Sequence, residues 1–196
     1  MIVLFGPAGS GKTTQGRLLA ERYGWKWLSV GQVLRDSGKF AKTLKEGGLV
    51  DDNEVIKLMN REIEKADAEG MEVILDGYPR DIIQARWMVE NNFFDKVKMA
   101  IVLDVPKEEL WKRIESRGRE DDEKEVVERR FNVFEQNICS ILPLMERAGV
   151  IVRKIDGVGD FEEITERLAE SLENELGDLT EQSDDLTRGG EQSYGE

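Results

Sequence analysis

The stretch that decides the fold is GPAGSGKTTQ at residues 6–15, which directly follows MIVLF at residues 1–5. Gly6, four intervening residues and then Gly11-Lys12-Thr13 match the P-loop pattern, here placed between an apolar strand and a helix. Glycines let backbone N–H groups converge on phosphate oxygens, the helix N-terminus adds a favourable dipole, and Lys12 supplies a mobile cation. An ordinary glycine-rich turn is the alternative, and the flanking strand and helix argue against it. The stretch therefore predicts a site for a phosphorylated ligand.

A P-loop by itself leaves three classes open: a switch GTPase, a motor ATPase and a kinase of a small molecule. The guanine-reading sequence Asn-Lys-x-Asp occurs nowhere in the chain, which argues against the GTPase. The molecule that receives the phosphate must be identified from other residues.

The composition limits the chemistry and the partners. A formal charge of −13 is unfavourable for binding nucleic acid, and the absence of histidine excludes a catalytic imidazole. The single cysteine, Cys139, excludes an internal disulfide and a four-thiolate zinc site, and its apolar neighbours predict that it is buried. The apolar runs are of strand length, so we expect no membrane span, and no basic leader precedes the first strand, so we expect a cytoplasmic protein.

Strands and helices alternate along the 196 residues, which suit one domain. Apolar runs rich in Val and Ile predict strands at residues 1–5, 25–30, 72–76, 98–105 and 150–156. Helices are expected at residues 11–24, 81–92, 106–117, 121–149 and 160–177, which indicates an α/β fold with a parallel sheet covered on both faces. In the last helix, Phe161, Ile164, Leu168 and Leu172 share one face.

Two segments fall outside this alternation. Residues 31–67 are helical in pattern and too long for one crossover helix, so they predict a small inserted subdomain. Residues 178–196 hold six acidic residues, one arginine and almost no apolar residues, so we expect a disordered tail after a domain spanning residues 1–177.

The segment DGYPRDIIQ at residues 76–84 carries polar groups at the end of a predicted parallel strand. Ligands bind at this edge in open α/β folds, and a carboxylate there, on Asp76, suits the water shell of Mg²⁺. Gly77 allows close approach to the backbone, Pro79 fixes the turn, and the planar fork of Arg80 can hold a phosphate. Gln84, one helical turn later, offers both a donor and an acceptor to the edge of a base.

Six segments, in order, resemble the adenylate kinase family of nucleoside monophosphate kinases: GPAGSGKTTQ, LSVGQVLR, GGLVDD, ILDGYPRDIIQA, RGREDD and ERRF. The resemblance covers roughly residues 1–175. It implies the P-loop NTPase fold with a five-stranded parallel sheet and a helical insertion at about residues 30–67 that binds the monophosphate. It also implies Mg²⁺-dependent phosphoryl transfer from ATP to AMP by a monomer, with small nucleotides as the partners and no zinc.

The resemblance also assigns residues to roles. Arg80 and Arg35 would hold the AMP phosphate, Gln84 would read the base, and Arg113 would stack on the ATP adenine. The implied catalytic residues are Lys12, Arg80, Arg117, Arg119 and Arg130. The implied ATP-binding residues are Gly9, Ser10, Gly11, Lys12, Thr13, Thr14, Arg113, Arg117 and Gly159. The implied AMP-binding residues are Val30, Arg35, Gly48, Leu49, Val50, Gly77, Tyr78, Pro79, Arg80, Gln84, Arg119 and Arg130. Thr13 and Asp76 would bind Mg²⁺, directly or through water.

Arginine suits this chemistry because phosphoryl transfer to an anionic phosphate needs charge neutralisation and no general base. Without the motif context, the arginines between residues 113 and 130 would be read as a solvated helix face. Arg119 precedes a helix that we expect Asp121 or Asp122 to cap, with Glu125 completing a capping box.

The chain departs from the family pattern at four places. Only Gly118 separates Arg117 from Arg119, so the lid is reduced to about residues 117–119. Thr13 replaces a glycine and could ligate Mg²⁺ directly, Gln32 replaces an aspartate, and Val30 stands where threonine is common. A UMP/CMP kinase and a non-catalytic ATP-binding switch protein remain the alternatives.

Overall fold

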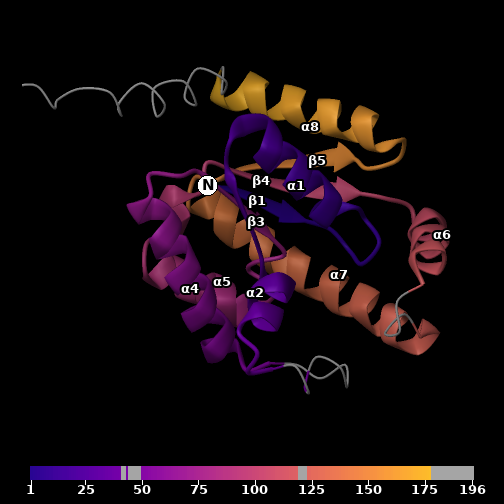
Figure 1. The fold of residues 1–196 in the computed structure, drawn as a ribbon, viewed down its shortest axis with the longest axis horizontal. Coiled ribbons are helices and arrows are strands. Elements are labelled where there is room, and N and C mark those ends of the chain that lie inside the picture. The colour runs from indigo at the N-terminus through magenta and orange to yellow at the C-terminus, as the bar shows by residue number, and fades with distance from the viewer. Residues whose placement is uncertain (41–42, 44–49, 119–122, 178–196) are drawn as a thin grey trace, which may run out of the picture.

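The computed structural model describes residues 1–40, 43, 50–118 and 123–177, except for the side chain of Arg117. Five parallel strands form one sheet (Figure 1): β1 (Ile2–Phe5), β2 (Lys26–Ser29), β3 (Val73–Asp76), β4 (Met99–Asp104) and β5 (Ile151–Asp156). Their spatial order is β2-β3-β1-β4-β5. The predicted α/β fold with a five-stranded parallel sheet is confirmed.

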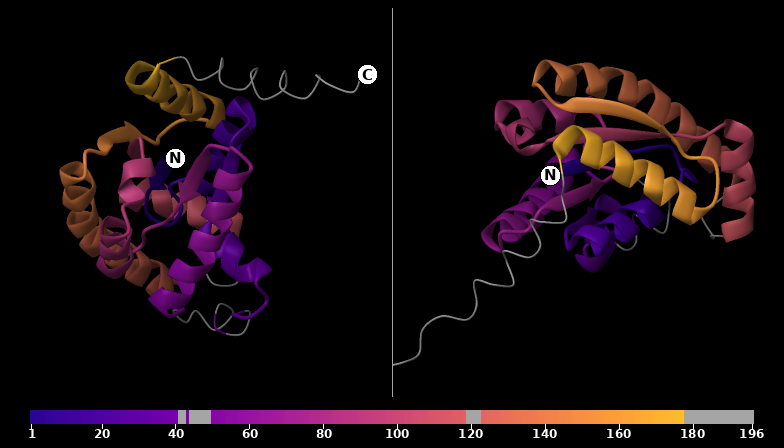
Figure 2. Two further views of the ribbon diagram at one scale, coloured as in Figure 1. Left: turned by 90° about the vertical axis from the view of Figure 1, so that its left-hand side faces the viewer. Right: turned by 90° about the horizontal axis from the view of Figure 1, so that it is seen from above.

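The alternation of side chains along β1 explains the layers. Val3 and Phe5 belong to one buried cluster, and Ile2 and Leu4 belong to a second cluster on the opposite face. On the first face lie α2 (Val30–Asp36), α4 (Asp52–Ala68), α5 (Ile82–Glu90), α7 (Lys124–Arg147) and the short 3₁₀ helix η1 (Phe93–Lys96). The second face is covered by α1 (Lys12–Tyr23) and α8 (Phe161–Leu176), as the views of Figure 2 show.

The remaining helix, α6 (Lys107–Arg117), lies at one end of the sheet (Figure 1). Leu110 and Ile114 of α6 pack with Val127 and Phe131 of α7 in a third, smaller cluster. This contact holds α6 beside the first half of α7, which carries the predicted catalytic residue Arg130. Within the described residues, no helix combines the length and the apolar character that crossing a membrane requires.

Helix ends follow local chemistry. α1 begins after Gly11, which has φ +90°, and ends at Gly24, whose left-handed backbone donates its N–H to the carbonyl of Ala20. Asp81 caps α5 by accepting from the N–H groups of Ile83 and Gln84, at 2.8 and 3.0 Å. The first residues of α1 and α5 are therefore fixed beside the ends of β1 and β3.

Three local expectations are wrong. β2 ends at Ser29, and Val30 is the first residue of α2. α7 begins at Lys124 after Glu123, with no side-chain cap, whereas Asp121 and Asp122 lie outside the described residues. Cys139 is exposed, because it lies two residues before buried Ile141 and therefore about 200° around the helix from it.

The predicted apolar face of the last helix is correct for three of its four residues. Ile164, Leu168 and Leu172 are buried, but Phe161 is 58% exposed. Phe161 is the first residue of α8, ahead of the turns that cover the sheet, and its carbonyl accepts from Gln15 Nε2 at 3.0 Å. The residues of α2 and α4 share their buried cluster with the sheet, so the predicted insertion at about residues 30–67 packs on the main core.

Candidate active site

The loop between β1 and α1 has the backbone of a phosphate cradle. Gly9 and Gly11 have φ values of +81° and +90°, which glycine adopts with little strain. A Cβ on Gly6 would lie 2.4 Å from Ser10 Oγ, so Gly6 cannot carry a side chain without displacing that hydroxyl. Ser10 Oγ is buried and has no hydrogen-bond partner among the described residues. Lys12 Nζ donates to the carbonyl of Pro7 at 3.1 Å, which places the ammonium over the loop.

The end of β3 lies beside this loop because Leu4 of β1 is in register with Asp76 of β3. Asp76 is 2% exposed, and its Oδ2 accepts a hydrogen bond from Thr13 Oγ1 at 2.7 Å. A hydroxyl and a carboxylate at the mouth of a P-loop are hard oxygen donors of the kind that bind Mg²⁺ together with waters and phosphates. The pair therefore fits the predicted metal site in chemistry and in place.

Arg80 brings a second cation to the same point. Its Nε donates to the carbonyl of Gly77 at 3.0 Å. A Cβ on Gly77 would lie 3.7 Å from both Nε and Nη2 of Arg80 and 3.9 Å from Cε of Lys12. Gly77 has φ +72°, so this residue combines a left-handed backbone with two cationic side chains at close range. Lys12 and Arg80 thus border the same glycine.

The electrostatics of Arg80 show which other cations are near. Burial lowers the pKa of the Arg80 guanidinium, the Asp76 carboxylate opposes that change, and the charges of Arg130 and Arg35 lower the pKa further. Arg80 nonetheless remains exposed to solvent, so it is surrounded by protein while still facing water, as in a cleft. Arginine stays protonated under such a shift, so its positive charge remains available for an anion. Residues of α1, α2, α7 and the β3–α5 loop therefore gather cations around Arg80.

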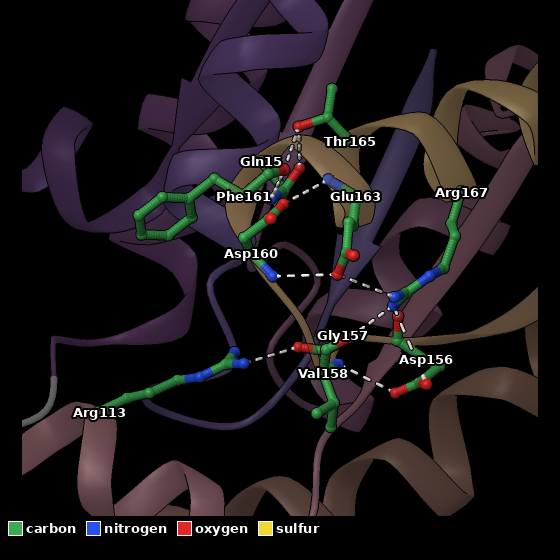
Figure 3. A network of polar contacts seen from close by, with 10 residues as sticks. All are labelled: Gln15, Arg113, Asp156, Gly157, Val158, Asp160, Phe161, Glu163, Thr165 and Arg167. Carbon is green, nitrogen blue, oxygen red and sulfur yellow. Dashed lines mark hydrogen bonds and ion pairs between the residues drawn. The ribbon is translucent and has the colours of Figure 1, made fainter.

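A fourth arginine, Arg113, lies between the P-loop and the loop after β5. Arg113 of α6 donates from Nη2 to the carbonyl of Gly157 at 2.9 Å (Figure 3). Its Nε donates to Glu109 at 3.0 Å. A Cβ on Gly11 would lie 3.9 Å from Arg113 Nη1. Gly159, two residues beyond Gly157, has φ +130°. The predicted ATP-binding residues Gly11, Arg113 and Gly159 are therefore brought to one side of the P-loop.

Among the predicted AMP-binding residues that the structure describes, Gln84 joins α5 to α4. Gln84 is 2% exposed; its Oε1 accepts from the backbone N–H of Arg80, and its Nε2 donates to Asp52 Oδ1, both at 2.8 Å. Tyr78 is also buried, and burial, followed by the charges of Asp81 and Asp52, raises the pKa of its phenol. Pro79 follows Tyr78 through a cis peptide bond.

The other predicted residues divide into two groups. Val30 is fully buried at the start of α2, Val50 packs against the core, and Thr14 is exposed in the first turn of α1. Gly48, Leu49, Arg119 and the tail at 178–196 lie outside the described residues. Arg117 ends α6, and only its backbone is described.

Two polar contacts of this region were not predicted. Asp52, in the GGLVDD segment, binds Gln84 across 32 residues of sequence, and Gln32 accepts from Arg35 Nη2 at 2.9 Å. Tandem acids at the start of a helix are a capping pattern, and Asp51 does accept from the N–H of Asn53 at 3.0 Å. That pattern accounts for Asp51 and gives no indication of the contact that Asp52 makes.

The fold and this arrangement define a class. A P-loop on a five-stranded parallel sheet, with cations gathered opposite it at the end of the neighbouring strand, is the machinery of a phosphotransferase of the nucleoside monophosphate kinase type.

Comparisons with known proteins give the family. The family model described as adenylate kinase matches residues 4–150. Proteins named adenylate kinase are similar over most of the chain. The one from Maricaulis maris is 35% identical over 187 residues, covering 88% of this chain and 98% of its own length. One from Thermus thermophilus is 33% identical, covering 87% of this chain and 96% of its own length. The chain belongs to the adenylate kinase family.

Proposed function

We propose that this enzyme catalyses the reversible transfer of the γ-phosphoryl group of ATP to AMP, giving two ADP. The observation that carries the proposal is the convergence of cations at Gly77: Lys12 and Arg80 border this glycine, and the charges of Arg35 and Arg130 act on Arg80. Two polyanions can meet in such a cleft because their mutual repulsion is offset by fixed positive charge.

In this mechanism the bond between the γ-phosphorus and the β–γ bridging oxygen breaks as a bond to an AMP phosphate oxygen forms. That oxygen is already anionic, so no residue has to remove a proton. Lys12 and the P-loop N–H groups hold the β- and γ-phosphates, and Arg80 and Arg35 orient the acceptor phosphate. We assign Arg117, Arg119 and Arg130 to the charge of the moving phosphoryl group.

We assign Thr13 and Asp76 to a Mg²⁺ ion, on the strength of their hydrogen bond at the mouth of the P-loop. When bound, the metal neutralises phosphate charge and aligns the β- and γ-phosphates. We also propose that Arg113 and Gly159 lie at the ATP base, and that Val30, Val50, Tyr78, Pro79 and Gln84, with Gly48 and Leu49, surround the AMP base.

We further propose that the enzyme is monomeric and acts in the cytoplasm. The described helices pack on both faces of one sheet, and the sheet and helices share their buried clusters within the chain. Size-exclusion chromatography with light scattering tests the monomer, and a mass of twice 22.3 kDa would overturn it.

A coupled assay of ADP formation tests the activity directly, with ATP as donor and AMP, CMP, UMP or GMP as acceptor. We expect transfer to AMP at the highest kcat/KM, loss of rate with EDTA and recovery with Mg²⁺. A diadenosine polyphosphate should inhibit competitively against both nucleotides, since it spans both sites. Preference for CMP or UMP would identify a pyrimidine kinase, and ATP binding without transfer to any monophosphate would overturn the proposal.

A further inference from the structure

The side chain of Gln84 is pinned at both ends of its amide. Its oxygen accepts from the backbone N–H of Arg80, and its nitrogen donates to the carboxylate of Asp52, each at 2.8 Å. The backbone N–H of Gln84 is itself held by Asp81 at 3.0 Å. With only 2% of the residue exposed, water has little access to replace any of these partners.

The two amide contacts demand the same orientation. A backbone N–H can only donate, so the atom that faces Arg80 must be the oxygen, and a carboxylate accepts, so the atom that faces Asp52 must be the nitrogen. Rotating the amide by half a turn would place an NH₂ against the N–H of Arg80 and an oxygen against the carboxylate. Both reversed contacts are repulsive, so the orientation is fixed twice.

The pinned amide retains one lone pair on Oε1 and one hydrogen on Nε2. A base that presents a donor and an acceptor to these atoms in the matching order can bind, as the amino group and N1 of adenine do. Hypoxanthine, the base of IMP, exchanges the two roles, because it has an oxygen at position 6 and a hydrogen on N1. An amide that could rotate freely would accept either base equally well.

Asp52 belongs to a cluster that keeps its carboxylate in place. It is the first residue of α4, which packs beside α5 on the same core (Figure 1), and Asp51 caps this helix. Burial and the neighbouring Asp52 carboxyl raise the pKa of Asp81, which shows that the two carboxyl groups lie close together. The charges of Asp81 and Asp52 also raise the pKa of the buried Tyr78 phenol, so Tyr78 lies near both carboxylates.

We infer that Asp52 is a positioning residue that holds the Gln84 amide in one orientation and thereby makes the monophosphate site select adenine over bases with the reversed hydrogen-bond order, such as hypoxanthine. This inference rests on the proposed reading of the AMP base by Gln84. Asp52 needs no contact with the nucleotide for this role.

The test compares AMP with IMP, which share the same ribose and phosphate, so that effects on phosphate binding cancel in the ratio of their kcat/KM values. Asp52→Asn keeps the size of the side chain but replaces a group that can only accept with one that can also donate, so that the rotated amide loses one of its two repulsive contacts and only the N–H of Arg80 still opposes it. Asp51→Asn removes the same charge one residue away, and asparagine caps a helix as well as aspartate does.

We expect the AMP-to-IMP ratio to fall about five- to tenfold in Asp52→Asn, the effect of one hydrogen bond. The ratio should change less than about twofold in Asp51→Asn. Equal ratios in the two variants would overturn the role of Asp52.

Gln84→Met separates this inference from the assignment on which it rests, because methionine fills the space without hydrogen bonding. We expect its ratio to fall further than that of Asp52→Asn. If the AMP-to-IMP ratio falls in Gln84→Met but not in Asp52→Asn, the positioning role of Asp52 is overturned and the reading of the base by Gln84 stands. A ratio unchanged in Gln84→Met overturns the reading of the base by Gln84, and with it the inference.

Discussion

Replacing Thr13 by valine removes one hydroxyl from the mouth of the P-loop and leaves the side-chain shape almost unchanged. That hydroxyl donates to Asp76 at 2.7 Å, and Asp76 is 2% exposed. A buried carboxylate that loses a donor cannot recover it fully from water, so the variant must be less stable than the wild type. Valine and threonine have similar helix propensities, so α1 itself is little affected.

The size of the effect follows from the environment of the bond. A hydrogen bond to a charged group contributes about 1.5–3 kcal/mol, and the exposed position of Thr13 favours the lower end of that range. We therefore expect the free energy of unfolding to fall by about 1.5 kcal/mol, which is roughly 3–6 °C in Tm for a chain of this length. Urea unfolding of the nucleotide-free protein in EDTA measures this without any contribution from the metal.

Thr13→Ser is the matched control, because it retains the hydroxyl and should keep most of the stability. In the kinase assay, the Mg²⁺ concentration for half-maximal rate should rise in the valine variant and stay near the wild-type value in the serine variant. If the valine and serine variants were equally stable, the hydrogen bond to Asp76 would contribute nothing and the reasoning would fail.

Three further predictions follow from the geometry of the site. Gly9→Ala should lower the free energy of unfolding by about 2 kcal/mol or more, because φ is +81° and the new methyl would lie 2.9 Å from Ile114 Cγ1. Gly24→Ala, which has φ +66° and open space around it, is the control and should lower it by about 1 kcal/mol. Equal losses in the two variants would contradict the clash with Ile114. Arg80→Lys should lower kcat/KM for AMP about 100-fold with little change in Tm, because an ammonium cannot replace the planar fork; a loss under about threefold would refute the role of the fork. Asp81→Asn should stabilise the protein at pH 7 by on the order of 0.5 kcal/mol while retaining the cap. Burial and Asp52 raise the pKa of Asp81 above its ordinary 3.8, so the folded state binds that proton more tightly and the wild type loses stability as the pH rises through the raised pKa. The gain in Asp81→Asn should therefore shrink toward pH 4, and urea unfolding that showed the same difference at pH 4 and pH 7 would contradict the shift.

Much of the fold could be predicted because its determinants are local. The P-loop spacing, the five runs rich in Val and Ile, and the glycine at the end of α1 each lie within one short segment. Their periodicity fixes the type of element, and parallel strands joined by helices then require helices on both faces of the sheet. The errors fell where packing decides: Cys139 has apolar neighbours in sequence and Phe161 lies at helical spacing from Ile164 and Leu168, yet both residues are exposed.

The candidate site, like the fold, was predictable from the sequence only in part. The sequence by itself determined which residues are candidates for the chemistry, because the P-loop glycines, Lys12 and Arg80 occupy positions defined by a strand end and the turn after it. Only the tertiary structure decided which of them share a cleft and what holds them there. Thr13 and Asp76 are 63 residues apart, and Gln84 and Asp52 are 32 apart. Such contacts depend on how the sheet aligns β1 with β3 and on how α4 packs beside α5, and no local spacing encodes the distance between side chains that separate helices bring together.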